Sequence, residues 1–123
     1  MDKQVEIEQI LNELRSIIGF FGADLVDLQE GKAMASVSIH PEIDTSEISR
    51  IGAEAINVYI KGAVAAKNPY PITLVQVTTE FLTSLQQVLG NTHFVVLALE
   101  STGDIEAAKI KLAEVSERIK TYL

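Results

Sequence analysis

One stretch decides the fold: residues 43–67, which read IDTSEISRIGAEAINVYIKGAVAAK. Its first residues carry signals for the start of a helix. Asp44 is placed to accept from the amide three residues on, and Glu47 to reach back to the amide of Asp44, which makes a capping box. Ile43 and Ile48 have the spacing of a hydrophobic staple. The prolines within residues 68–71 cannot continue a helix. The stretch therefore predicts one long helix, Ile43 to Lys67.

Apolar or small residues cover most of the circumference of this predicted helix. A helix that packs only on its own domain needs a single apolar face. One stripe at helical spacing consists of Ile48, Ile51, Ala55, Val58, Tyr59 and Gly62. A second set covers much of the remainder: Gly52, Ile56, Ile60, Ala63, Val64 and Ala66. We therefore expect the helix to pack on a sheet and also on something outside the chain.

Composition bounds the class of protein. The 123 residues, 47% hydrophobic and 22% charged, fit a single domain spanning residues 1–123. A formal net charge of −7 without a basic cluster argues against a nucleic-acid partner, because phosphate backbones attract lysine and arginine. Cysteine is absent, which excludes disulfides and thiolate metal sites. No apolar run has the length of a membrane span, and the first residues lack a signal-peptide pattern. We therefore expect a cytoplasmic protein.

Hydrophobic periodicity predicts the other elements. Apolar residues three and four positions apart indicate amphipathic helices, and strict alternation indicates half-buried strands. Asp104 and Glu106 favour the start of the last helix. The predicted elements are a helix at Val5–Ile18, strands at Phe20–Leu28, Ala33–Ile39, Ile72–Thr78 and Phe94–Leu99, and a last helix at Ile105–Tyr122.

Residues Phe81–Leu89 fit either a strand or a helix. In a helix, the apolar residues of this segment would lie together on one face. A nine-residue helix is only marginally stable, however, and it would leave the neighbouring strands hard to connect. We therefore predict a strand. The fold class expected is α+β: a single five-stranded antiparallel sheet, with the first and last helices on one face and the long central helix on the other.

The sequence offers no constellation for catalysis. His40 and His93 lack a carboxylate or second histidine at helical ligand spacing, and neither a Gly-x-Ser-x-Gly elbow nor a phosphate-binding glycine loop is present. We predict no catalytic residue, no metal site and no cofactor. Asp24 and Asp27 lie in or near the first predicted strand, and we expect them to face solvent or a turn.

Several stretches resemble the roadblock/dynein light-chain proteins of the roadblock–longin superfamily. They are LRSIIGFFGADLVD at residues 14–27, the hairpin around Gly31, the long central helix, and FVVLAL at residues 94–99 before a loop and a last helix. The resemblance implies a sheet between one helix and a helix pair. It also implies a homodimer in which third strands pair edge to edge and central helices pack together. Such proteins have no catalytic activity; they scaffold or regulate small Ras-like GTPases or serve motor complexes.

We therefore expect a non-enzymatic, homodimeric interaction module that scaffolds or regulates a small Ras-like GTPase, or a motor or polarity complex. The alternatives are a hot-dog-like thioesterase and a profilin-like sensor of a small ligand, which needs a pocket between sheet and helix. The residues expected at the dimer interface are Ile51, Ala55, Val58, Tyr59, Gly62, Ala63, Thr73, Val75 and Val77. Those expected to bind the partner are Glu47, Arg50, Glu54, Asn57 and Lys61.

Overall fold

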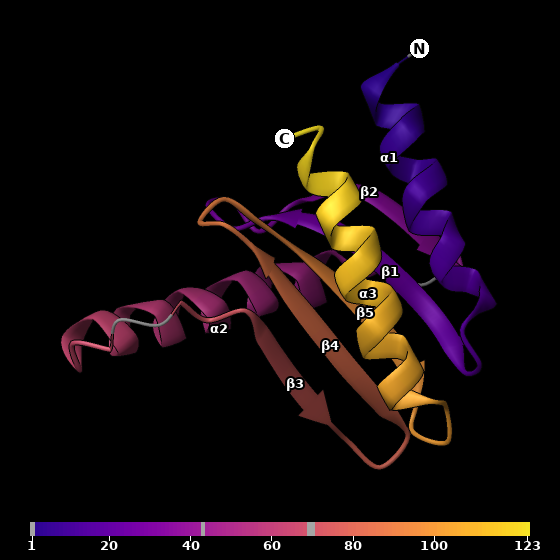
Figure 1. Cartoon of the computed structure of the whole chain (residues 1–123). Coiled ribbons are helices and arrows are strands. Elements are labelled where there is room, and N and C mark those ends of the chain that lie inside the picture. The colour runs from indigo at the N-terminus through magenta and orange to yellow at the C-terminus, as the bar shows by residue number, and fades with distance from the viewer. Residues whose placement is uncertain (1, 43, 69–70) are drawn as a thin grey trace.

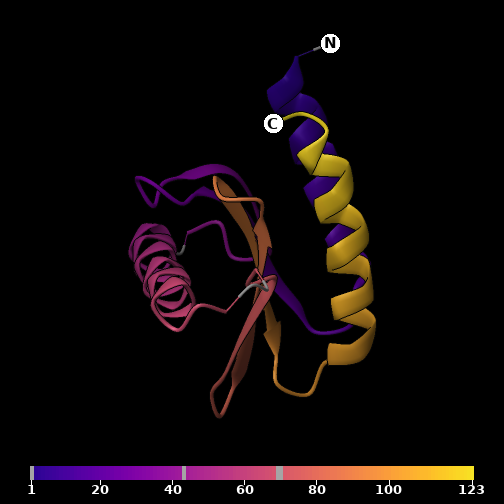
Figure 2. The same ribbon diagram turned by 60° about the vertical axis from the view of Figure 1, so that its left-hand side comes forward.

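The computed structural model describes residues 2–42, 44–68 and 71–123. In these ranges the elements are α1 (Lys3–Asn12), the 3-10 helix η1 (Glu13–Ser16), β1 (Phe20–Asp27), β2 (Ala33–Ser38), α2 (Ser46–Ala65), β3 (Leu74–Thr78), β4 (Leu82–Leu89), β5 (His93–Glu100) and α3 (Ile105–Lys120). They form three layers, with α2 on one face of the sheet and the pair α1 and α3 on the other (Figure 1). Figure 2 shows the sheet nearly edge-on between these two layers.

The sheet is antiparallel, with the strand order β2-β1-β5-β4-β3. The predicted fold class is confirmed. The strand predicted at Phe81–Leu89 is present as β4 from Leu82, which pairs with β5 over Leu82–Leu89 and with β3 over Thr83–Gln87. Directly paired residues in antiparallel strands point to the same face of a sheet, so the register assigns each side chain to one of the two layers.

The sheet separates two apolar cores. The larger lies under α1 and α3 and includes Leu11, Leu25, Leu97 and Leu112. The smaller lies under α2 and consists of Val26, Leu28, Ala53, Ile56, Val88, Phe94 and Val96. The central strand β5 contributes to both cores, which confirms that its continuous apolar run is buried on both faces.

Small residues let α2 approach the sheet and the β1–β2 turn closely. A Cβ atom on Gly52 would lie 3.3 Å from Cζ of Phe94, so this helical position has little room for a side chain. Gly31, in the turn, has φ of +71°, and a Cβ there would lie 2.9 Å from the Cα of Arg50. Only glycine meets both demands, because it adopts positive φ freely and has no Cβ.

The capping box predicted for the central helix is wrong. α2 begins at Ser46, and Asp44 Oδ1 accepts from the amide of that residue, two positions on, at 2.9 Å. Glu47 does not reach back, because both of its carboxylate oxygens bind Arg50 one turn later. The Arg50 guanidinium thus occupies the oxygens that the capping box would have used. The predicted staple involves Ile43, which lies outside the described residues.

Other predicted boundaries also shift. The helix predicted to reach Ile18 ends at Asn12 and continues as the tighter η1, a common form of last turn. α2 ends at Ala65 and not at Lys67, because Lys67 takes a φ of 57°. The amides of Lys67 and Asn68 donate to the carbonyls of Val64 and Ala63, which is a Schellman motif.

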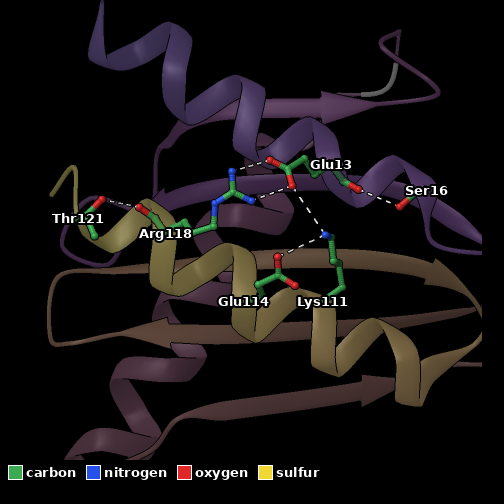
Figure 3. Close-up of polar contacts among 6 residues, drawn as sticks. All are labelled: Glu13, Ser16, Lys111, Glu114, Arg118 and Thr121. Atoms are coloured by element: carbon green, nitrogen blue, oxygen red, sulfur yellow. Dashed lines mark hydrogen bonds and ion pairs between the residues drawn. The ribbon is translucent and has the colours of Figure 1, made fainter.

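An ion-pair cluster fastens η1 to α3 (Figure 3). Arg118 Nη1 lies 2.7 Å from Glu13 Oε1, and Nη2 lies 2.7 Å from Oε2. Lys111 Nζ lies 3.7 Å from Glu13 Oε1 and 3.5 Å from Glu114 Oε1. Two parallel contacts between a guanidinium and a carboxylate define their relative orientation, so the pair sets where η1 lies along α3.

Candidate interaction surface

α2 has two different apolar faces. Its inner face is buried on the sheet through Ser49, Gly52, Ala53 and Ile56. Its outer face stays open: Val58 is 66% exposed and Tyr59 55% exposed. The outer apolar stripe consists of Ile48, Ile51, Ala55, Val58, Tyr59 and Gly62, of which only Ala55 is half-buried. The two-sided character predicted from the sequence is thus present in the folded chain.

The helical residues expected at a dimer interface all lie on or beside this outer stripe. Ala63 stands at its margin, half-buried beside Ile60 and Val64. Gly62 is exposed, and a Cβ built on it would meet no atom within 4 Å. The C-terminal half of α2 also projects past the edge strand β3 (Figure 1). A surface for a second body is therefore available at this end of the helix.

The three strand residues expected at the interface divide between surface and core. Thr73 is exposed, and Val77, on the α2 side of the sheet, is 47% exposed. Val75 is half-buried and packs against the core under α2. Val77 and the outer stripe of α2 therefore present apolar surface on the same side of the sheet.

The outer edge of β3 carries peptide groups that point away from the sheet. The bond from Val88 N to Thr73 O and the register of β3 with β4 direct the peptide groups of Leu74, Gln76 and Thr78 outward. In the described ranges, no backbone hydrogen bond from another segment reaches them. An open edge of this kind is a template for a further strand.

At the opposite edge of the sheet, side chains bind backbone carbonyls of the edge strand β2. Gln4 Nε2 donates to the carbonyl of Met34 at 2.6 Å, and Arg15 Nη1 donates to that of Ser38 at 3.5 Å. Both carbonyls belong to β2, and both donors come from the first helical segment. Of the two sheet edges, β3 is therefore the one left ready to pair.

The residues expected to bind a partner form a polar stripe beside the apolar one. Arg50 bridges Glu47 and Glu54, with contacts of 2.7 and 2.6 Å. The hydrogen bond from Arg50 lowers the pKa of Glu47, and the same bond raises the pKa of Arg50. Lys61 is exposed at the far end of the stripe. Asn57 differs from the others, because its Nδ2 donates to the carbonyl of Leu28 and ties α2 to the β1–β2 turn.

The expectation that Asp24 faces solvent or a turn is wrong. Asp24 is only 7% exposed, and its Oδ2 accepts from the hydroxyls of Thr45 at 3.0 Å and Ser49 at 3.4 Å. The strand alternation held a signal for this, since Asp24 shares a strand face with Val26, which is fully buried under α2. Sequence reasoning missed it because the two donors are 21 and 25 positions away.

The polar contacts of the two histidine rings are to neighbours in the sequence, and the ring of His40 also lies 5.0 Å from that of Phe21. His40 Nδ1 lies 3.4 Å from a carboxylate oxygen of Glu42, and His93 Nδ1 lies 2.7 Å from the hydroxyl of Thr92. Within residues 2–42, 44–68 and 71–123, no group of three histidine, aspartate or glutamate side chains is placed to hold a metal ion. Across the same ranges, no helix has the length and apolar character needed to cross a membrane.

No protein-family model matches the sequence, and no curated protein matches it either. Solved structures do match the fold. Myxococcus xanthus MglB superposes with a TM-score of 0.88 at 12% identity, over 98% of this chain and 90% of that one. A Roadblock/LC7 domain from Streptomyces avermitilis gives a TM-score of 0.83 at 9% identity, over 94% and 95% of the two chains. The chain has the roadblock fold.

A further roadblock-like structure supports the same assignment. The gliding protein MglB from Thermus thermophilus gives a TM-score of 0.86 at 14% identity, over 99% of this chain and 91% of that one. The roadblock arrangement accounts for the order of elements and for the placement of helices on both faces of the sheet. At these identities the likeness concerns the fold alone.

Proposed function

We propose that this roadblock-like chain is a cytoplasmic, non-enzymatic homodimeric interaction module that scaffolds or regulates a small Ras-like GTPase, or a motor or polarity complex. The observation that carries the proposal is the outer stripe of α2. The helix already buries one face on its own sheet, yet it keeps an apolar second face open. Contiguous exposed apolar surface on a soluble domain marks an interaction site.

A second copy of the chain is the first partner that this surface fits. The open β3 edge and the outer stripe of α2 lie next to each other, so a single two-fold contact would cover both with one self-complementary patch. Gly62 supports close helix approach. In a helix, glycine costs about 1 kcal/mol relative to alanine, and nothing in the isolated chain requires it at this position. The name of one roadblock-like structure, MglB with tetrameric arrangement, is in keeping with self-association.

The GTPase partner rests on the resemblance of the sequence to the roadblock family and on the polar stripe of α2. A dimer made through the apolar stripe would leave Glu47, Arg50, Glu54 and Lys61 at its margin, available to a further protein. Charges at such a rim act on the encounter rate and on the choice of partner more than on affinity. The description of the Thermus protein as a gliding protein agrees with a role in polarity or movement.

Two measurements test this proposal. Light scattering at micromolar concentration should give about twice the chain mass of 13.4 kDa. Isothermal titration should then detect binding to a small Ras-like GTPase from the same organism, loaded in turn with GDP and with a GTP analogue. A folded dimer that gives no heat with either nucleotide state would remove the GTPase and retain only the self-association.

The thioesterase alternative has no observation in its favour, because helices cover both faces of the sheet, and among the described residues neither histidine lines the cavity beside α2. The sensor alternative has one observation behind it, which is a cavity between the sheet and the start of α2.

A further inference from the structure

A cavity of about 460 Å³ opens on the α2 side of the sheet, beside the first turn of that helix. Its walls come from β1, β2, β5 and the segment that leads into α2, with Leu82 contributed by β4. Among the described residues, none from β3 lines it. The cavity therefore lies away from the β3 edge, and it shares only Ile48 with the outer stripe of α2.

Small side chains on the sheet leave this space open. Gly22 of β1 pairs directly with Ala98 of β5, and both line the cavity. The backbone of Gly22 has no positive φ that would demand glycine. A Cβ there would lie 3.4 Å from the carbonyl oxygen of Val37 and 3.6 Å from Oγ of Ser38, which is ordinary contact. A larger residue fits the strand at this position but would occupy the cavity.

Asp24 forms the polar part of the wall. Its side chain is more than nine-tenths buried, and its Oδ2 is satisfied by the hydroxyls of Thr45 and Ser49. Its Oδ1 accepts no hydrogen bond from any residue in the described part of the chain. That oxygen stays accessible from the cavity, so a cationic donor there can reach it and form a charge-assisted hydrogen bond.

The remaining lining sets the chemistry of an occupant. Asp44 is the other charged residue on the described wall, and no lysine, arginine or histidine appears there. The field inside the cavity is therefore negative. Ile48, Leu82 and Val96 provide apolar surface in the same lining. A mostly apolar pocket with one or two convergent polar groups is the usual form of a small-molecule site.

We propose that this cavity binds a small organic cation, with a primary ammonium group that donates to Oδ1 of Asp24 and a short apolar body that contacts Ile48 and Val96. The two carboxylates of the site lie outside the outer stripe, and binding requires no GTPase. The role assigned to the site is binding. A ligand there would bridge β1 to the start of α2 and so stabilise the helix that carries the outer stripe.

Butylammonium chloride is the probe, with butan-1-ol and sodium butyrate as neutral and anionic analogues of equal length. The experiment follows amide chemical shifts of the full chain at constant ionic strength. Butylammonium should saturate shifts at the residues that line the cavity, and butanol should bind about tenfold more weakly, since its neutral hydroxyl lacks the Coulomb attraction of an ammonium group to the carboxylate. Butyrate should leave those residues unchanged.

Two variants locate the site. Asp24→Asn keeps an acceptor for Thr45 and should weaken butylammonium binding about tenfold or more. Glu117→Gln removes the same charge from an exposed position on α3, on the other side of the sheet, and should leave binding unchanged. Gly22→Val retains Asp24 but places a branched side chain in the cavity beside it, and should weaken binding even if Asp24→Asn proves unstable. Equal affinity for butanol, shifts spread over the acidic surface, or undiminished binding by Gly22→Val would each overturn the proposal.

Discussion

Arg118 and Glu13 hold two parallel contacts of 2.7 Å across a separation of 105 positions in the sequence. The hydrogen bond from Arg118 lowers the pKa of Glu13, and Lys111 adds to that effect. A carboxyl group whose pKa is lower in the folded chain than in the unfolded chain stabilises the fold above its unfolded pKa. That contribution is lost as the pH falls through the folded pKa.

The melting temperature of Glu13→Gln should therefore fall less steeply than that of the native chain as the pH is lowered. Thermal melts from pH 7 down to pH 3 should show a difference between the native chain and the variant at neutral pH that disappears at the acid end. The difference should be only a few degrees, because both partners are partly exposed to solvent. Glu117→Gln is the control: Glu117 is exposed on the same helix as Arg118, and changing it should produce no such pH-dependent difference.

Val58→Glu should break the dimer and leave the fold intact. Val58 is two-thirds exposed in the isolated chain, so a charge there costs little until a second helix buries it. Light scattering should show the mass of one chain, while the circular dichroism spectrum stays unchanged. Lys61→Glu, on the polar stripe of the same helix, is the matched control and should remain dimeric. Ala63→Glu tests the margin of the interface in the same way.

Gly62→Ala separates the effect of this residue on helix stability in the single chain from its effect on dimerisation. In the chain alone the new methyl group meets nothing within 4 Å, so the variant should gain about 0.5–1 kcal/mol in helix stability. If α2 packs against its copy at this point, the same methyl group should weaken dimerisation. Measured dimer dissociation constants would decide between these effects. A variant that is more stable and equally dimeric would place the helix contact elsewhere.

Gln76→Pro tests the open edge of β3. The amide of Gln76 points away from β4, so its loss removes no bond of the sheet but prevents one to a second β3 strand. The variant should stay folded and show a reduced dimer mass. Val75→Pro provides the contrast, because that amide faces β4, and the variant should lower the melting temperature of the chain itself.

Arg50→Glu should weaken GTPase binding while the dimer persists. Arg50 now neutralises Glu47 and Glu54, and its reversal would place three carboxylates along the polar stripe. Isothermal titration should show a loss of affinity, with a larger effect at low salt than at high salt because the charges are exposed. Unchanged affinity at both salt concentrations would direct the search for the contact surface away from α2.

Local pattern was sufficient for most of the architecture. The apolar run from Phe94 to Leu99 indicated a strand buried on both faces, and β5 is that strand. Apolar residues around most of the circumference of residues 43–67 indicated a helix with two packing faces. In the structure, one face of α2 packs on the sheet and the other is open. Such features follow from hydrophobic periodicity, which shows which faces of a helix or strand are buried. They can be predicted without knowing which segment or partner covers each face.

Only the tertiary structure decided which groups meet. Asp24 is buried because Thr45 and Ser49 reach it from a distant helix, and Glu47 leaves its expected cap because Arg50 offers a charged partner. The unequal edges of the sheet likewise depend on Gln4 lying beside β2. Hydrophobic periodicity is a property of each segment alone, whereas a polar side chain takes the strongest partner that the folded chain brings within reach.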